Sequence, residues 1–204
     1  MTDQRIIVAI DTYDLTLANF ILDQLDPDHC RVKIGSVVFN SLGKLFLHEV
    51  SRRGFKIFLD LKLHDIPNTV HETILGFHDC SIDMLTVHLS GGEDMLKKAM
   101  HAAKTIQTKV IGGRILTSLE ESDTLALFNN NLNDQMLNFF KLAKKTNLDG
   151  IVCSPLELAM ANTILDKHSI KITPGIRDIS AEDDQARTMN AKDAIKNGAT
   201  FLVI

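Results

Sequence analysis

The stretch KIFLDLKLHDIPNT, from Lys56 to Thr69, contains the side chains most able to do chemistry in this sequence. Asp60, Lys62 and Asp65 place two carboxylates and one ammonium group close together. Each carboxylate favours the protonated lysine, which could then donate a proton or anchor an anion. It would make a poor Schiff-base nucleophile, because that reaction needs a neutral amine. A surface cluster of ion pairs would show the same spacing, so this pattern alone leaves both interpretations open.

The first half of the stretch alternates with a period of two, which predicts a β-strand. Its charged residues come only at the carboxyl end, and an Ile-Pro turn then leads into a helix. The two faces of the expected strand carry Ile57, Leu59, Leu61 and Leu63 on one side and Phe58, Asp60, Lys62 and His64 on the other.

Short β-branched runs alternate with helical patterns along the rest of the chain, which predicts right-handed crossovers and a parallel sheet. Eight such units favour an α/β fold of the (β/α)8 TIM-barrel type over an open doubly wound sheet. Neither a G-x-G-x-x-G nor a P-loop motif follows any run, which disfavours the nucleotide-binding open sheet. The expected strands are residues 6–11, 30–35, 57–64, 84–89, 110–118, 150–154, 170–176 and 201–204. The expected helices are residues 15–25, 42–53, 67–77, 93–102, 136–145, 156–165 and 191–197, and the longer connection around 128–131 is expected to be a loop.

The chain has 204 residues, 45% hydrophobic and 24% charged, which predicts a single globular domain over residues 1–204. The sequence ends at Ile204, inside the eighth expected strand, so the last helix of a barrel is absent from the given sequence. We expect a longer tail rather than a barrel that lacks this helix.

Composition also limits the possible partners. A net charge of −4, a single Tyr and no Trp give no reason to expect a nucleic-acid polymer as a ligand. Cys30, Cys80 and Cys153 are scattered among apolar neighbours, so they are interpreted as small buried residues rather than as a disulfide framework or a metal site. The sequence shows no signal pattern and no membrane-length apolar run, which predicts a cytoplasmic protein with no membrane partner.

Polar residues recur at the carboxyl ends of the expected strands, on the face that points into the barrel. Val, Ile or Leu would fill these positions in a purely structural core. Active sites of such barrels lie at this rim, so the convergence of ionisable groups favours a functional site. The residues concerned, besides Asp60 and Lys62, are Asp11, Lys33, Thr86, His88, Thr117, Ser118, Thr173, Pro174 and Gly175.

The segment ITPGIRD, from Ile172 to Asp178, is a candidate phosphate site because barrel enzymes bind phosphate at the loops after their last two strands. Gly175 would allow close approach of the backbone, and Arg177 can bind a phosphate through two hydrogen bonds. When this motif occurs alone, it more commonly indicates a turn followed by a surface arginine.

Together these motifs closely resemble the orotidine 5′-phosphate decarboxylase family. The resemblance rests on DLKLHDIPNT, Asp11 in AID, Lys33 in VKIG, LTS at 116–118, and TPGIR followed by Gln185, and it covers essentially the whole chain. It implies a (β/α)8-barrel homodimer that converts orotidine 5′-phosphate to UMP and CO2, the last step of de novo pyrimidine nucleotide synthesis. It also implies a lyase that needs neither a metal nor an organic cofactor.

The resemblance assigns a role to each matching residue. Lys62 would donate a proton to the pyrimidine C6, Asp60 would lie beside the departing carboxylate, and Lys33 would belong to the same charged array. Asp65 and Thr69 would be shared across the dimer interface with the other subunit's site. Asp11 and Lys33 would contact the ribose, and Thr117 would contact the pyrimidine edge. The phosphate would be bound at the loop that contains Pro174, Arg177 and Gln185. A Gly-Arg pair that follows the eighth strand in this family is not in the sequence.

Two alternatives stay open at this point. A related barrel with the same D-x-K-x-x-D block could use Mg2+, although Lys33 at the expected site disfavours a cation. A phosphate-binding protein without catalysis would keep Arg177 but would not need Lys62. His64 and His88 are the histidines expected near the rim, where packing or hydrogen bonding is favoured over metal binding or base catalysis.

Overall fold

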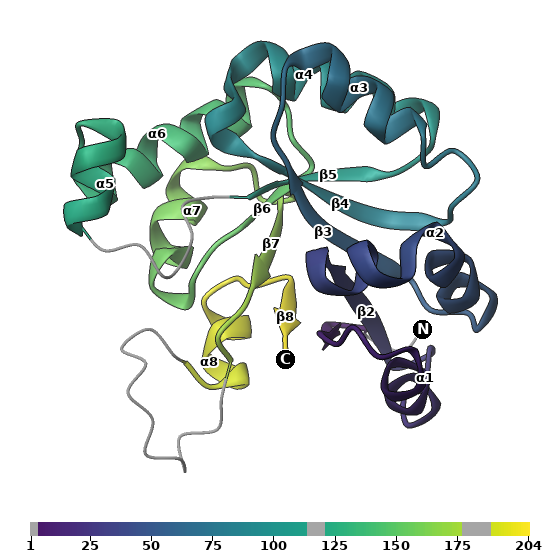
Figure 1. The fold of residues 1–204 in the computed structure, drawn as a ribbon. Coiled ribbons are helices and arrows are strands. Elements are labelled where there is room, and N and C mark those ends of the chain that lie inside the picture. The colour runs from purple at the N-terminus through teal and green to yellow at the C-terminus, as the bar shows by residue number, and fades with distance from the viewer. Residues whose placement is uncertain (1–3, 114–120, 177–188) are drawn as a thin grey trace.

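The computed structural model describes residues 4–113, 121–176 and 189–204 (Figure 1). In these ranges the strands form one closed parallel barrel in sequence order, with β8 paired to β1. The predicted (β/α)8 TIM-barrel fold is therefore confirmed. The strands are β1 Ile6–Ile10, β2 Cys30–Gly35, β3 Ile57–Leu63, β4 Ile82–His88, β5 Lys109–Gly113, β6 Gly150–Val152, β7 Ile170–Thr173 and β8 Phe201–Val203.

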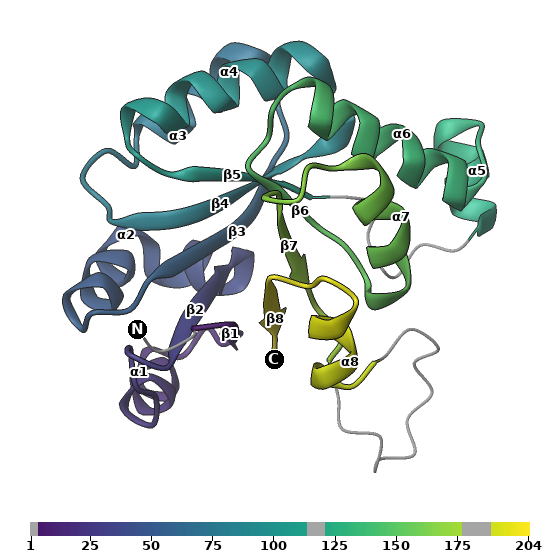
Figure 2. The same ribbon diagram turned by 180° about the vertical axis from the view of Figure 1, so that it is seen from behind.

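The helices lie around the outside of the strands, as the two opposite views show (Figures 1 and 2). Short 3-10 turns, η1 (Leu89–Gly91) and η2 (Pro155–Glu157), precede two of them. The α-helices are α1 Leu15–Asp23, α2 Ser36–Arg52, α3 Pro67–Leu75, α4 Gly92–Thr105, α5 Glu121–Phe128, α6 Leu132–Lys145, α7 Leu158–Ile164 and α8 Ala191–Lys196.

Two helices differ most from the prediction. α2 begins at Ser36 rather than at residue 42, and Gly43, with φ 65° and ψ −165°, interrupts it near its middle. The sequence analysis missed α5 entirely. Its Leu125 and Leu127 are 56% and 65% exposed, so α5 lacks the buried apolar stripe by which amphipathic helices are recognised.

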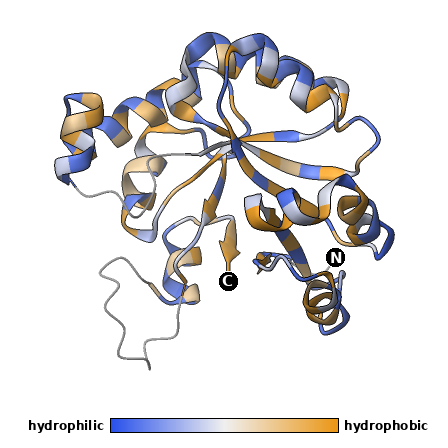
Figure 3. Cartoon of the chain, viewed as in Figure 1, coloured by the Kyte–Doolittle hydropathy of each residue, from blue (hydrophilic) through white to orange (hydrophobic). Residues whose placement is uncertain are grey.

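The hydrophobic residues pack in two layers, and the strands are accordingly coloured mainly as hydrophobic in Figure 3. The larger layer lies between the strands and the helices and includes Ile34, Leu59 and Leu85. A smaller cluster of inward-facing residues fills the barrel, namely Ile7, Phe58, Met84, Ile111 and Ile172. Phe58 in this cluster fixes which face of β3 points inward, and Asp60 and Lys62 follow it on that face, as the alternation predicted.

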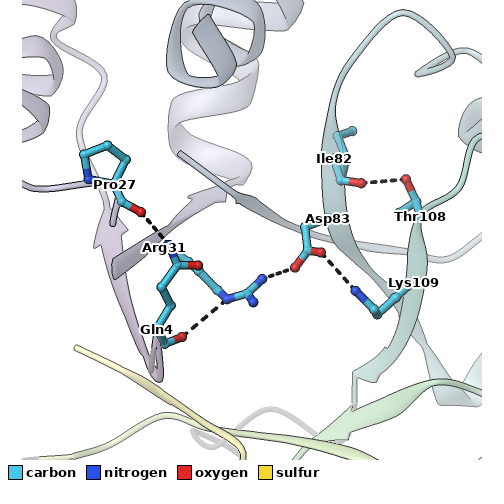
Figure 4. A network of polar contacts seen from close by, with 7 residues as sticks. All are labelled: Gln4, Pro27, Arg31, Ile82, Asp83, Thr108 and Lys109. Atoms are coloured by element: carbon cyan, nitrogen blue, oxygen red, sulfur yellow. Dashed lines mark hydrogen bonds and ion pairs between the residues drawn. The ribbon is translucent and has the colours of Figure 1, made fainter. Parts of the chain in front are cut away.

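A network of charged residues closes the amino-terminal end of the barrel (Figure 4). Arg31 on β2 donates to the carboxylate of Asp83, and Lys109 Nζ lies 2.9 Å from the same carboxylate. The Arg31 guanidinium also lies over the Phe201 ring, 4.5 Å from its centroid. Asp83 is the extra residue of a β-bulge, because Ile57 pairs with Ile82 while Phe58 pairs with Met84.

In the described part of the chain, no helix combines the length and the apolar character that crossing a membrane would require.

Candidate active site

The pair of Lys62 and Asp60 is the centre of the site at the carboxyl end of β3. Lys62 Nζ lies 2.9 Å from both carboxylate oxygens of Asp60. The Asp60 side chain is 14% exposed and that of Lys62 is 37% exposed. The carboxylate is thus mostly enclosed, while the ammonium it holds still faces the mouth of the barrel.

Thr86 on the neighbouring strand β4 fixes both members of this pair. Its hydroxyl donates a hydrogen bond of 3.0 Å to Asp60 Oδ1 and accepts one of 2.8 Å from the backbone N–H of Lys62. The Thr86 side chain is completely buried. The sequence analysis placed Thr86 on the inward face but gave it no role. The signal was a hydroxyl-bearing residue between the apolar residues Leu85 and Val87.

Lys62 itself has an unusual backbone conformation. Its φ is 49°, in the left-handed region, which costs a residue with a Cβ about 1 kcal/mol. The register between β3 and β4 shifts at the same place, between the pairs Leu59–Leu85 and Leu63–Val87. Strained residues that the surrounding structure holds in place are concentrated at functional sites, so this conformation supports a catalytic role.

Lys33 and Asp11 form a second pair at the ends of β2 and β1. Lys33 Nζ lies 3.1 Å from Asp11 Oδ1, and the lysine side chain is 14% exposed against 59% for the aspartate. Gly35, which follows on β2, pairs in register with Asp60. A Cβ at Gly35 would lie only 3.2 Å from Lys33 Nζ, so glycine leaves room for the ammonium beside the first pair.

Asp65 lies apart from Lys33, Asp60 and Lys62, with which it was predicted to form one charged array, and Thr69 lies on the same exposed segment as Asp65. Both residues are exposed, and the Asp65 carboxylate accepts a 2.7 Å hydrogen bond from the backbone N–H of Ile66. The structure therefore shows two ion pairs, Lys62–Asp60 and Lys33–Asp11, with Asp65 in neither. The array was wrong for a single chain because the strand ends between Lys62 and Asp65, so the alternation no longer applies.

Two histidines and a serine border the site, as expected for His64 and His88. Their rings stack with centroids 5.1 Å apart. His88 Nδ1 accepts hydrogen bonds from the Ser90 hydroxyl at 2.6 Å and the Ser90 backbone N–H at 3.2 Å. Burial, followed by the nearby His64 and Lys62, lowers the pKa of His88 below its ordinary value. His88 is therefore a neutral, hydrogen-bonded side chain at neutral pH.

The expected phosphate loop is described only in its first part. Pro174 is half-buried after β7, and Gly175 has a φ of 75°, which suits glycine. The other residues expected at the pyrimidine and phosphate, Thr117, Arg177 and Gln185, lie outside the described residues.

The described residues at this rim can hold an anionic substrate and supply a proton. Two ammonium groups lie at adjacent strand ends, each next to one carboxylate, and hydroxyl and imidazole groups surround them. A parallel (β/α)8 barrel with such a rim has the architecture of an enzyme, with its site at the carboxyl ends of the strands.

Comparisons with known proteins identify the family. The model of the "Orotidine 5'-phosphate decarboxylase / HUMPS family" matches residues 4–204. Orotidine 5'-phosphate decarboxylase of Vibrio parahaemolyticus serotype O3:K6 is 38% identical over 209 residues, covering 100% of this chain and 90% of the relative. The enzyme of the same name from Legionella pneumophila strain Paris is 39% identical over 205 residues, covering 98% and 90%.

Solved structures agree. The crystal structure of orotidine 5'-phosphate decarboxylase from Lactobacillus acidophilus superimposes with a TM-score of 0.87 at 32% identity, covering 98% of this chain and 89% of that one. An uncharacterized conserved protein from Geobacillus kaustophilus gives a TM-score of 0.84 at 26% identity, with the same coverage. This chain belongs to the orotidine 5'-phosphate decarboxylase / HUMPS family, and the predicted resemblance is confirmed.

Proposed function

We propose that this protein decarboxylates orotidine 5′-phosphate to UMP and CO2, the last step of de novo pyrimidine nucleotide synthesis, in the cytoplasm. The family and its full-length relatives support the reaction. The observation that carries the mechanism is the ammonium of Lys62, held 2.9 Å from both oxygens of Asp60 at the barrel mouth.

In the proposed reaction, the bond between C6 and the carboxylate breaks and its electron pair stays on C6. The resulting vinyl-type carbanion has almost no resonance stabilisation, so it needs a positive charge fixed nearby before the reaction begins. Lys62 supplies this charge and then donates a proton from Nζ to C6, after which the neutral lysine regains a proton from solvent. The step needs neither a metal nor an organic cofactor.

Asp60 and Thr86 would set the position of Lys62 for this transfer. Asp60 holds the ammonium through two contacts and, by family resemblance, would lie beside the departing substrate carboxylate. Thr86 fixes both the Asp60 carboxylate and the backbone of Lys62. Because proton transfer requires the donor within hydrogen-bond reach of the carbon, a small displacement of Nζ would slow the reaction.

The remaining substrate contacts are assigned by family resemblance. Lys33 and Asp11, already paired beside Asp60, would bind the ribose hydroxyls. Thr117 would contact the pyrimidine edge. Pro174, Arg177 and Gln185 would surround the phosphate, whose binding energy is available to orient the reacting ring.

The direct test follows the ultraviolet absorbance of the orotate ring with the purified protein and orotidine 5′-phosphate. Loss of this absorbance with formation of UMP is expected, and EDTA should leave the rate unchanged. Activity lost on chelation and restored by Mg2+ would favour the metal-dependent alternative. Nucleotide binding without turnover would favour a non-catalytic phosphate-binding protein.

We also propose that the active form is a homodimer in which Asp65 and Thr69 complete the partner's site. Both residues are exposed, and the neighbouring Ile66 is 67% exposed, so this segment is free to contact a second chain. Equal mixing of Lys62→Ala and Asp65→Ala subunits should restore roughly a quarter of wild-type activity, because hybrid dimers have one intact site. Absence of recovery, with subunit exchange shown independently, would contradict a shared site.

A further inference from the structure

A second cluster of chemically versatile side chains lies far from the barrel mouth. His48 is on α2, while Asp79 and Cys80 lie in the connection between α3 and β4, which enters the barrel from its amino-terminal end. The catalytic pair is at the opposite end, where β3 finishes. The sequence analysis treated Cys80 as a simple buried residue, because His48 is distant in the sequence and only the fold brings the two together.

The three side chains offer one nitrogen, one oxygen and one sulfur atom to a common point. His48 Nε2 lies 3.6 Å from Asp79 Oδ2 and 4.0 Å from Cys80 Sγ, and Cys80 Sγ lies 3.6 Å from Asp79 Oδ1. All three potential ligand atoms lie within 4.8 Å of one another. The three side chains therefore lie close enough to bind one ion, with His48 facing one oxygen of the Asp79 carboxylate and Cys80 facing the other.

The separations between these side chains are close to those around a bound zinc ion. Zinc bonds of about 2.0–2.3 Å at tetrahedral angles separate neighbouring ligand atoms by about 3.4–3.6 Å. The 3.6 Å between His48 Nε2 and Asp79 Oδ2 already has this length, whereas the 4.0 Å between His48 Nε2 and Cys80 Sγ is about 0.5 Å too long, and Cys80 Sγ would have to approach Oδ2 rather than Oδ1. Sulfur, imidazole and carboxylate together are typical of zinc, whereas magnesium and calcium prefer oxygen ligands.

We propose that His48, Asp79 and Cys80 form a zinc-binding site at the amino-terminal end of the barrel, with solvent in the fourth coordination position. The site is open on one side, because Asp79 and Cys80 border a surface pocket of about 490 Å3. His48 and Asp79 are 41% and 45% exposed, while Cys80 is 6% exposed. The buried thiol thus forms the floor of the site, and the other two ligands form its rim.

Lys44, one helical turn before His48, competes with a metal ion for this site. Its ammonium donates hydrogen bonds to Asp79 Oδ1 at 2.6 Å and to the carbonyl of Gly76 at 2.8 Å. This contact is the main reason that the pKa of Asp79 falls to about 2, so the carboxylate is ionised. Oδ2 remains directed at His48, and a nearby positive charge should weaken metal binding without blocking it.

A bound ion would join two elements that are distant in the sequence. It would connect the second half of α2 to the residues that lead into β4, beside the existing Lys44 contact. A ligand that binds the folded chain more tightly than the unfolded chain stabilises the fold. The site is therefore expected to be structural, and turnover at the opposite end of the barrel should not depend on it.

The test uses the untagged, full-length protein, treated with chelator and then titrated with Co2+ as a spectroscopic substitute for Zn2+. The wild-type protein should bind one ion and show the near-ultraviolet charge-transfer band of a thiolate–cobalt bond. Competition with a chromophoric chelator then gives the Zn2+ affinity. Zn2+ should raise the thermal unfolding midpoint in a saturable way.

Three variants locate the ligands and the competitor. Cys80→Ser should abolish the charge-transfer band and weaken Zn2+ binding at least roughly tenfold, and His48→Gln should weaken binding similarly. Lys44→Met should tighten binding, because it removes the competing ammonium and leaves the three ligands in place. Cys30→Ser is the matched control for loss of a buried cysteine and should change neither band nor affinity.

The proposal is overturned if the wild-type protein shows no thiolate–cobalt band, or if Cys80→Ser and His48→Gln bind Zn2+ as tightly as the wild type. Circular dichroism of each variant distinguishes loss of a ligand from loss of the fold. Decarboxylase activity is a separate readout, so a negative metal result leaves the proposed reaction standing.

Discussion

The two ends of the barrel contain the same kinds of charged residue in different settings. At the amino-terminal end, Asp83 is bound by two cations, and one of them, Arg31, also stacks on Phe201. At the carboxyl end, Asp60 and Asp11 are each bound by one lysine, and the Lys62 side chain is 37% exposed against 12% for that of Arg31. Ionic groups whose charge and hydrogen bonds are fully satisfied within the chain stabilise a fold. Groups that are only partly satisfied within the chain can also interact with a ligand. This comparison predicts that substitutions at the two ends affect different properties.

The largest expected effect is on catalysis at the rim. Lys62→Ala should lower kcat at least roughly a thousandfold, because it removes both the proton donor and the fixed charge. Its free energy of unfolding should fall by no more than about 2 kcal/mol, because the mostly enclosed Asp60 loses its cation but keeps the hydrogen bond from Thr86. The ultraviolet assay and urea denaturation measure the two quantities. The variant should still bind a non-reactive substrate analogue, and wild-type turnover would refute the assignment.

The matching substitution at the amino-terminal end of the barrel should have the opposite effect, lowering stability rather than kcat. Arg31→Met should lower the free energy of unfolding by roughly 2–4 kcal/mol, because it leaves the mostly buried Asp83 with one cation fewer. The activity of the folded fraction should be unchanged. Arg31→Lys, which keeps the charge but loses the planar fork, should lie between wild type and Arg31→Met in urea denaturation. A loss of kcat without loss of stability would show that the two ends are not separable.

Substitution of Thr86 should affect both kcat and stability, because its side chain is buried and also contacts the site at the carboxyl end of the barrel. Thr86→Val keeps the shape but removes the hydroxyl that fixes Asp60 and Lys62. We expect kcat to fall about tenfold with KM nearly unchanged, and the free energy of unfolding to fall by about 1–2 kcal/mol. Thr86→Ser should restore both. Equal losses in Thr86→Ser and Thr86→Val would indicate packing rather than positioning.

The smallest effect concerns the pH dependence of stability at the rim. The pKa of His88 in the folded chain lies below the ordinary 6.5, mainly because of burial. As the pH falls through this value, the unfolded chain binds a proton before the folded chain does, so the free energy of unfolding decreases. Urea denaturation at pH 7.5 and 5.5 should show a smaller decrease for His88→Asn than for wild type. The same decrease in both proteins would assign the pH dependence to other groups.

The sequence predicted the barrel well, because alternation of strands and helices depends on local patterns of apolar residues. It also predicted the inward face of β3, since Phe58, Asp60 and Lys62 keep a period of two. It did not predict the left-handed Lys62 or the bulge at Asp83, because both depend on the register of neighbouring strands, which no local pattern contains. It also did not predict the separate position of Asp65, which lies beyond the end of β3.

Contacts between residues that are distant in the sequence could not be predicted either. Thr86 was placed on the correct face, yet its bonds to β3 depend on the shifted register between the two strands. The contact of His48 with Asp79 and Cys80 likewise requires the packing of α2 beside the α3–β4 connection. The exposed helix α5 was missed because its sequence shows no buried stripe.

The positive φ of Lys62 has a consequence for the engineering of this enzyme. Glycine adopts that backbone conformation without strain, so glycine at position 62 would relieve about 1 kcal/mol of backbone strain while losing the ion pair with Asp60. A selection for heat resistance that ignores turnover therefore exerts little pressure to keep the residue to which the reaction is assigned. Stabilised variants of this barrel must be screened for product formation at every round.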